Sequence, residues 1–407
     1  MRDHQPPLRV DFKITDVFAC ILQKDKRDAF ERIHTDLAVA YSVRTLWLTL
    51  LESLALKPGD EIILSAINIL QMADIVRALS LKPIVVDIDP IALLPRVEDI
   101  EKLVTKRTKA VLIAHLFGTW SDLEAHAQVC RKRNIVLVED CAQCFMGPEF
   151  NGSPSADLTF FSFGNIKRSS AAGGGICALK SELIPAVFVN KLENYSEDSS
   201  FEFLKKVAKA SVLALVTHRL AYSIFYCTLR IFANDPIGVL REYARGFKSS
   251  EESNLKQYRR ALHPIHKRLI QRKWMEGFDF RAADRTEFKI ALEKNCPNPH
   301  HLFPGNVADV HTYWLFPIRV SDTDRISQML VEQNFHVTRG LTSLRCLDDT
   351  AENASNLFES MIYLCVDRPT DPDFFKGILC QVDYVKAAIN IEGKGNYQCL
   401  ISRPTDY

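Results

Sequence analysis

The sequence has almost no excess charge, because 51 Lys and Arg stand against 50 Asp and Glu in 407 residues. That balance gives no electrostatic reason to expect nucleic acid as the main partner. The 11 cysteines are odd in number and scattered, and the first residues show no apolar stretch after a basic start. We therefore expect a cytoplasmic protein without a disulfide framework or a secretion signal.

Long apolar runs are missing as well. The most membrane-like stretch, residues 210–240, is interrupted by His218, Arg219, Arg230 and Pro236. No uninterrupted run reaches the roughly 20 apolar residues that span a bilayer. Internal repeats and low-complexity tracts are also absent, so we expect an ordinary globular protein.

Residues 38–180 alternate short apolar runs with longer helical patterns, which is typical of a largely parallel sheet covered by helices. The expected crossover helices are 66–80 and 122–133. We predict an α/β fold with strands at 61–65, 83–89, 110–116, 135–140, 159–163 and 175–179.

This alternation stops at about residue 183. From there to about residue 273 the chain is apolar, aromatic and basic, with Leu213, Val216, Leu220 and Ile224 at helical spacing. Three interpretations remain open: helices packed on the core or across an oligomer interface, a membrane-surface or lipid-substrate patch at 195–245, or a site for a protein partner.

At this length about two domains are expected. We place a large α/β domain at 1–273, with the apolar helical insertion at about 190–250, and a small α+β domain at 274–407. In the small domain we predict strands at 312–320 and 336–340 and helices at 323–333 and 374–388.

Asp140 ends the run IVLVED, and Lys167 precedes a turn rich in Gly and Ser. An acidic residue at the carboxyl end of a parallel strand lies where open α/β sheets bind ligands. Pyridoxal phosphate (PLP) requires such a pair, because a carboxylate keeps its ring nitrogen protonated and an amine forms a Schiff base with its aldehyde. Taken alone, each residue also fits a turn-forming Asp or a solvated Lys.

Two features could hold the phosphate of this cofactor. Ser42, Val43, Arg44 and Thr45 lie at an expected helix N-terminus, where free N–H groups and the helix dipole favour an anion. Ser162, shortly before Lys167, could add a hydroxyl.

Six stretches in order make the sequence resemble the DegT/StrS-type aminotransferases, fold-type I PLP enzymes that mostly aminate nucleotide-linked keto sugars. They are YSVRTLWL, LKPGDEIIL, LSLKPIVVDIDP, TKRTKAVLIAHLFG, VLVEDCAQ and FSFGNIK with the following AAGGGICAL. The resemblance covers about residues 36–182, is weaker after Trp274, and is absent from 190–250. It implies a homodimer and a place in polysaccharide biosynthesis.

By this resemblance, Lys167 forms the internal aldimine and Asp140 is the partner of the pyridinium nitrogen. Gln143 would hydrogen-bond the ring oxygen of the cofactor, and Ser162 would bind its phosphate. Related dehydratases carry a histidine where this chain has Lys167. The resemblance therefore implies transamination, with Lys167 as covalent anchor and general acid/base.

The chain also departs from the family pattern. Arg44 and Thr45 take the place of a phosphate-binding Gly-Thr pair, and Val43 replaces a glycine, so the backbone must approach the phosphate differently. Arg44 can offer a guanidinium there. Ile69 falls where the family commonly has an aromatic residue that stacks on the ring. The Asn that a partner subunit lends to the phosphate is not recognisable.

The remaining candidates are weaker. Cys141 and Cys144 form a CxxC, but no second pair completes a zinc set, so we expect no metal and interpret both as small residues behind the cofactor. The four histidines at 263, 266, 300 and 301 are expected at the surface. His115 fits a pocket residue or a structural histidine equally well, and Arg339 is a candidate for contacting a substrate anion.

These observations predict an aminotransferase that moves an amino group from glutamate or glutamine to a keto substrate, most simply a nucleotide-linked keto sugar. Two alternatives stay open. The apolar insertion would also suit a lipid-linked or otherwise hydrophobic carbonyl substrate, and the departures at Val43 and Ile69 leave room for a catalytically silent scaffold or regulator of the same fold.

Overall fold

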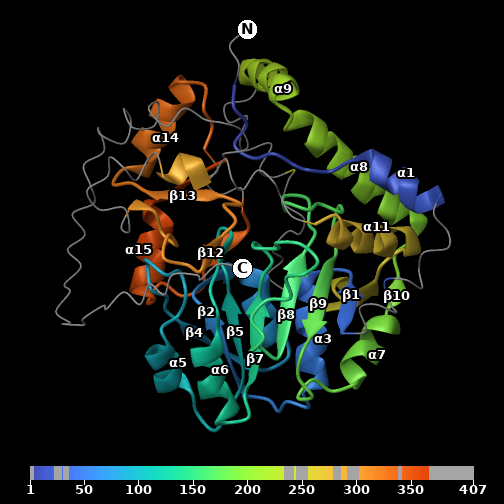
Figure 1. Cartoon of the computed structure of the whole chain (residues 1–407), viewed down its shortest axis with the longest axis vertical. Helices are drawn as coiled ribbons and strands as arrows, with labels where there is room; N and C mark the ends of the chain where they lie inside the picture. The colour runs from blue at the N-terminus through green and yellow to red at the C-terminus, as the bar shows by residue number, and fades with distance from the viewer. Residues whose placement is uncertain are drawn as a thin grey trace, which may run out of the picture.

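The protein is described from a computed structural model over residues 4–22, 30, 36–232, 243, 255–277, 286–290, 302–337 and 342–365. Its centre is a seven-stranded sheet in the order β1-β9-β8-β7-β5-β2-β4 (Figure 1). The strands are β1 (Leu37–Ala40), β2 (Glu61–Ser65), β4 (Lys82–Val86), β5 (Thr108–Ala114), β7 (Val136–Asp140), β8 (Leu158–Ser162) and β9 (Gly175–Leu179). The five from β4 to β8 run parallel, and β9 pairs antiparallel with both β8 and β1, so β9 alone runs against the other six strands. The predicted α/β fold with a mainly parallel sheet is confirmed.

Alternating side chains along the strands bury both faces of the sheet. Ile62 and Leu64 face a core shared with α3 (Val43–Ser53), α4 (Leu70–Ala78) and α7 (Val187–Glu193). Ile63 faces the opposite core, with α5 (Val97–Leu103) and α6 (Glu124–Arg131). Helices on both faces leave the carboxyl edge of the parallel strands as the place for a site.

The second face continues into a layer of four helices beside β8 and β9. These are α1 (Ile14–Leu22), α8 (Ser200–Val216), α9 (Arg219–Phe232) and α11 (Pro264–Met275). Phe161 of β8 and Ile176 of β9 share one core with residues of all four. In Figure 1 these helices follow one side of the molecule. Within the same stretch of chain, two short strands, β10 (Ser196–Glu197) and β11 (Arg260–Ala261), pair with each other, and η1 (Leu255–Gln257) is a single turn.

The continuous apolar stripe expected from Leu213 to Ile224 is wrong, because the chain bends between α8 and α9. The backbone N–H and the hydroxyl of Thr217 both donate to the carbonyl of Leu213 and so end α8. Leu213 is consequently buried, whereas Leu220 points to solvent. Among the described residues no single helix has the length and apolarity to cross a membrane. The pair 200–216 and 219–231 passes that test together but is bent by 89°.

A smaller α+β part follows. Strand β13 (Phe316–Arg319) pairs antiparallel with β15 (Met361–Leu364), and α14 (Thr323–Glu332) and α15 (Glu352–Ser360) accompany them. Two strand pairs join this part to the large sheet domain: β12 (Val310–His311) with β6 (Thr119–Trp120), and β14 (Leu344–Cys346) with β3 (Ile67–Ile69). The predicted helix at 323–333 is confirmed.

The predicted strand at 312–320 is shorter than expected. Tyr313 has a left-handed φ of 48°, and the Thr312 N–H donates to the carbonyl of Gly118 at 2.7 Å. A Cβ on Gly118 would lie 2.7 Å from the backbone nitrogen of Trp314, so only glycine allows this approach. The predicted strand at 336–340 was also wrong at its start, since His336 and Val337 are not in a strand. Its other residues and the predicted helix at 374–388 lie outside the described residues.

The domain boundary at 273/274 stays a prediction. The N-terminal segment, which we assigned to the large domain, reaches the C-terminal part: the Gln5 N–H donates to the carbonyl of Asn334, and the His336 N–H donates to that of Gln5.

Candidate active site

Asp140 is the last residue of β7 and lies between Ala114 of β5 and Phe160 of β8. Its side chain is buried, and its Oδ1 accepts the backbone N–H of Ala142 at 2.9 Å. Burial raises the pKa of the Asp140 carboxyl, although the Ala142 N–H and the charge of Lys167 oppose that shift. A buried carboxylate with this bias is suited to a cationic partner.

Lys167 lies in the loop between β8 and β9. Its backbone N–H closes a turn onto the carbonyl of Gly164 at 2.9 Å. The side-chain Nζ lies 4.4 Å from the centre of the Trp314 ring, and the Trp314 indole N–H donates to the carbonyl of Ile166. Burial lowers the pKa of Lys167 to about 8, with the Asp140 carboxylate opposing and Arg44 adding to the shift. The amine is thus poised to gain and lose a proton near neutral pH.

The N-terminus of α3 meets the end of β8 beside this pair. Ser42 caps the helix, with its Oγ accepting the Thr45 N–H at 3.1 Å, as the sequence predicted. Gly175 is the register partner of Ser162, and a Cβ there would lie 3.1 Å from the nitrogen of Val43. The missing side chain of Gly175 therefore lets the helix N-terminus approach Ser162. An anion at this point would meet a hydroxyl and the positive end of a helix.

Val43, Arg44 and Thr45, at the start of α3, have different surroundings. Val43 is buried, and the Thr45 hydroxyl lies 3.1 Å from the Ser42 hydroxyl in the cap. The Arg44 side chain bonds to Tyr258, and its charge acts on both Asp140 and Lys167. Burial lowers the pKa of Arg44. Arg44 therefore brings a buried cation to the pair, whereas Thr45 serves the helix cap.

Gln143 lies in the loop three residues beyond Asp140, and Ile69 is the last residue of β3. Oε1 of Gln143 accepts the Phe117 N–H at 2.7 Å, so its amide group is the part that can donate to the oxygen of a ligand. Ile69 is the register partner of Leu344 and packs between two cores. An aliphatic residue thus stands where the resemblance predicted an aromatic one.

The structure favours the structural role for His115. Its Nε2 lies 2.9 Å from Oε1 of Glu139, which is fully buried behind Asp140. Glu139 also accepts bonds from the Trp120 indole and the Thr159 hydroxyl. Burial alone would raise the pKa of Glu139. The hydrogen bonds and charges of His115 and the other partners outweigh burial and lower this pKa to about 2. Sequence reasoning missed Glu139, although an acidic residue within a buried strand was a signal.

His115, Glu139 and Cys141 are the potential metal ligands that come close together in the described part of the chain. Nε2 of His115 bonds Oε1 of Glu139, and both Glu139 oxygens accept further donors. Burial raises the pKa of the Cys141 thiol. Cys141 and Cys144 are both free thiols and form a hydrogen bond with each other. This set fits a buried hydrogen-bond network better than a metal centre.

The surface assignment of His266 is wrong. This residue is fully buried in α11, with Nε2 2.9 Å from the carbonyl of Ala171, and burial lowers its pKa to about 3. Its neighbour His263 caps α11. His300, His301 and Arg339 lie outside the described residues.

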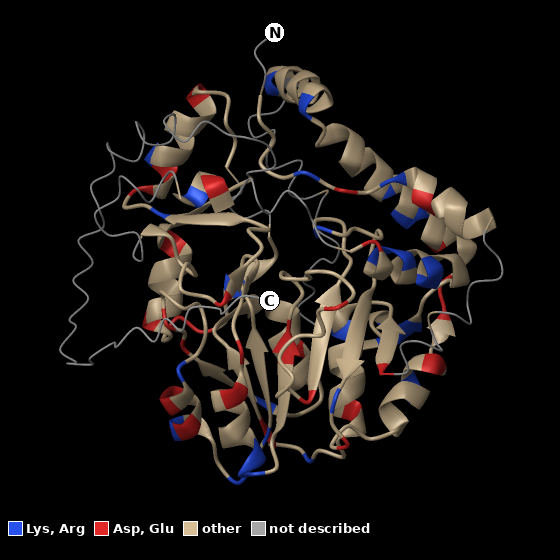
Figure 2. Ribbon diagram, viewed as in Figure 1, with Lys and Arg blue, Asp and Glu red and all other residues tan. Residues whose placement is uncertain are grey.

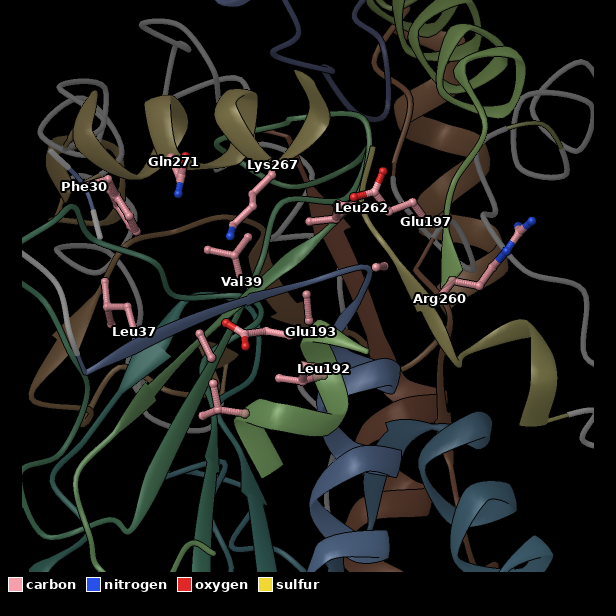
Figure 3. A pocket seen from close by; sticks show the side chains of 14 residues that line it. Phe30, Leu37, Val39, Leu192, Glu193, Glu197, Arg260, Leu262, Lys267 and Gln271 are labelled. Carbon is pink, nitrogen blue, oxygen red and sulfur yellow. The ribbon is translucent and has the colours of Figure 1, made fainter. Parts of the chain in front are cut away.

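A cavity of about 450 Å³ lies away from these residues, along the outer edge of β1 (Figure 3). Lys267 and Gln271 reach into it from α11, and Glu193 from α7. None of the predicted site residues lines it. The chemistry of Asp140 and Lys167 is thus separate from this cavity.

Two solved enzymes with this fold share little sequence identity with the chain. A sugar aminotransferase from Micromonospora echinospora aligns with a TM-score of 0.62 and 16% identity over 92% of this chain and 98% of that one. A GDP-4-keto-6-deoxy-D-mannose-3-dehydratase from E. coli with bound hydrated PLP aligns with a TM-score of 0.62 and 15% identity over 93% and 100%. The fold is therefore that of the fold-type I PLP-dependent transferases.

Residues 27–202 match the model of the DegT/DnrJ/EryC1/StrS aminotransferase family. A "pleiotropic regulatory protein" of Geobacillus stearothermophilus is 34% identical over 31% of this chain and 34% of that protein. A GDP-perosamine synthase of Escherichia coli O157:H7 is 31% identical over 38% and 43%. The matches thus span less than two thirds of the length of these relatives.

Proposed function

We propose that this protein is a PLP-dependent aminotransferase acting on a nucleotide-linked keto sugar, with glutamate or glutamine as the amino donor. The observation that carries the proposal is the placement of Lys167 beside Asp140. Both are buried, each acts on the pKa of the other, and they lie at the carboxyl edge of the sheet. The family match and the GDP-perosamine synthase likeness support it.

The residues present fit PLP. Its phosphate matches the anion site formed by Ser162 and the N-terminus of α3, which Gly175 holds together. Its ring nitrogen matches the buried Asp140, because burial raises the pKa of this carboxyl and a cation beside it would stabilise the ionised form. When bound, PLP carries the amino group between donor and acceptor and accepts electron density from the reacting carbon.

The residues of the chain have separate tasks in this proposal. Asp140 holds a proton on the ring nitrogen of the cofactor. Lys167 anchors the cofactor and moves protons, since a pKa of about 8 leaves about a tenth of the amine neutral at pH 7. Trp314, packed over Nζ, excludes water on that side. Arg44 adds a positive charge for the phosphate.

The test is an absorption spectrum of the purified protein, recorded with and without borohydride and beside Lys167→Ala. A visible band that borohydride removes, absent from the variant, supports cofactor binding at Lys167. Loss of the band on adding glutamate or glutamine, with transfer of the amino group to a nucleotide-linked keto sugar, supports the full proposal. No band after incubation with excess PLP contradicts it and favours a scaffold or regulator.

Homodimer formation and a cytoplasmic location remain predictions. Light scattering of the purified protein tests the first, and fractionation of cells that express it tests the second.

A further inference from the structure

Three neighbouring helices expose large apolar side chains. In each, the exposed residues repeat at helical spacing and lie on the side away from the core. We call them the apolar outer face, and they are between 57% and 82% exposed: Phe18, Leu22, Phe201, Leu204, Leu215, Leu220, Ile224 and Ile231.

The opposite sides of the same helices are already buried. Val17 of α1, Phe203 and Leu213 of α8 and Tyr222 of α9 all belong to one core. The fold therefore does not need the outer residues for packing. A helix that is apolar on both sides normally lies between two apolar surroundings. Clusters of exposed apolar side chains mark interaction surfaces.

Among the described residues, no single helix has the length and apolarity of a membrane span. Helix α8 has 17 residues, which gives it a length of about 25 Å, and α9 turns away from it by 89°. Both helices also have one side packed against the protein. Helices with these properties can lie in the plane of a lipid surface with the outer side buried among the lipids.

The charge of the same helices selects the kind of surface. Helices α8 and α9 contain five Lys and Arg and one Glu, whereas α1 adds one Asp and no basic residue. Helix α11 beneath them adds four Lys and Arg, of which Arg272 and Lys273 pair with Asp16 and Glu276. The whole chain has a net charge of only +1. Figure 2 shows these basic residues along the same side of the molecule. The surroundings of the apolar face are thus complementary to an anionic surface.

One contact shows how the apolar and basic groups share the face. The ammonium of Lys205 lies 4.4 Å from the centre of the exposed Phe201 ring and 2.9 Å from Glu202. A lysine in this position can extend its charge toward lipid phosphates while the ring beside it enters the apolar region.

We propose that the apolar outer face of α1, α8 and α9 docks on an anionic lipid surface. The core beneath it also contains Phe163 and Ala171, which flank the loop of Lys167. Docking therefore brings the site within one helical layer of the membrane. The docking itself does not depend on the catalytic proposal.

Co-sedimentation of the full chain with vesicles tests the docking. We expect the protein to sediment with vesicles of phosphatidylcholine and phosphatidylglycerol, to stay in solution with phosphatidylcholine alone, and to be released by salt. The variant Leu204→Gln/Ile224→Gln should bind at least tenfold more weakly. The matched control Leu183→Gln/Val307→Gln changes two apolar residues that are also exposed but lie outside this face, and should bind like the wild type.

Circular dichroism and light scattering accompany each variant. A folded wild-type protein that does not bind the anionic vesicles overturns the proposal, and so does equal loss of binding in the control variant. If Leu204→Gln/Ile224→Gln instead turns a dimer into a monomer and no form binds vesicles, the face is a contact between copies of this chain. The cofactor spectrum is read separately, so failure of docking and failure of the catalytic proposal are distinguishable.

Discussion

The Nζ atom of Lys167 lies 4.4 Å from the centre of the Trp314 ring, and the indole N–H of Trp314 donates to the carbonyl of Ile166. One side chain from the C-terminal part thus covers the amine and also fixes the loop that carries it. The surroundings of Lys167 are therefore formed by both the large sheet domain and the C-terminal part.

Replacing Trp314 with leucine should raise the pKa of Lys167. Burial is the largest cause that lowers this pKa from 10.5 to about 8, and a smaller residue admits water. Loss of the cation–π contact acts in the opposite direction but contributes only about 0.5–1 kcal/mol, less than one pKa unit. The measurement is the pH dependence of Lys167 acetylation in cofactor-free protein, followed by peptide mass spectrometry with exposed Lys106 as reference. A midpoint that stays near pH 8 would contradict the role given to Trp314.

Replacing Asp140 with asparagine should lower the pKa of Lys167, because the carboxylate stabilises the ammonium. A nearby opposite charge shifts a pKa by about one unit or more. The same acetylation experiment should therefore show a midpoint at lower pH than in the wild type. The variant should also bind PLP but transfer amino groups slowly, since the ring nitrogen loses its anionic partner. An unchanged midpoint would show that the two side chains are not coupled.

Lys167→Ala should abolish covalent attachment of PLP and reduce amino transfer by about 10²–10⁴-fold, the usual contribution of a general acid/base. The measurement is the transfer rate from glutamate to a nucleotide-linked keto sugar, together with the mass of the borohydride-treated protein. Lys106→Ala is the matched control, since Lys106 is exposed and does not belong to the site. Wild-type rates in Lys167→Ala would remove Lys167 from the mechanism.

Ser162→Ala should weaken PLP binding by about 10- to 100-fold, because a hydrogen bond to a charged group contributes about 1.5–3 kcal/mol. Gly175→Ala should weaken it as well, since a Cβ there would lie 3.0 Å from the Phe161 carbonyl and 3.1 Å from the Val43 nitrogen. The measurement is a titration of cofactor-free protein with PLP. Ser155→Ala, a hydroxyl before the start of β8, should bind normally, and a similar loss in that variant would argue against a phosphate site at Ser162.

Glu139→Gln should destabilise the fold by about 3 kcal/mol, because it disturbs a buried charge that holds several partners. The folded pKa of Glu139 is about 2, below its ordinary 4.5. Its ionised form therefore stabilises the protein fully above pH 4.5, and this contribution disappears as the pH falls toward 2. Urea unfolding at several pH values should show that the difference in the free energy of unfolding between wild type and variant becomes smaller as the pH falls from 4.5 toward 2. A constant difference would contradict the low pKa.

Much of the candidate site could be predicted from the sequence. Asp140 ends the short strand run IVLVED, Ser42 is a residue type that caps helices, and Lys167 precedes a glycine-rich turn, so each signal lies within a few residues. The sequence could not predict the burial of His266, because its surroundings come from the Ala171 loop and α8 rather than from its own helix. The same holds for Tyr258, which meets Arg44 only after the chain returns to the sheet.

The sequence by itself determined the mainly parallel sheet and the pair of Asp140 and Lys167 at its edge, because hydrophobic periodicity and strand-end residues are local properties of the chain. Only the tertiary structure decided that Trp314 covers Lys167 and that Glu139 hydrogen-bonds both His115 and Trp120. It also decided that α8 and α9 bend apart with one apolar side left exposed. Each of these outcomes depends on contacts between distant segments, whose geometry is fixed when the layers pack together.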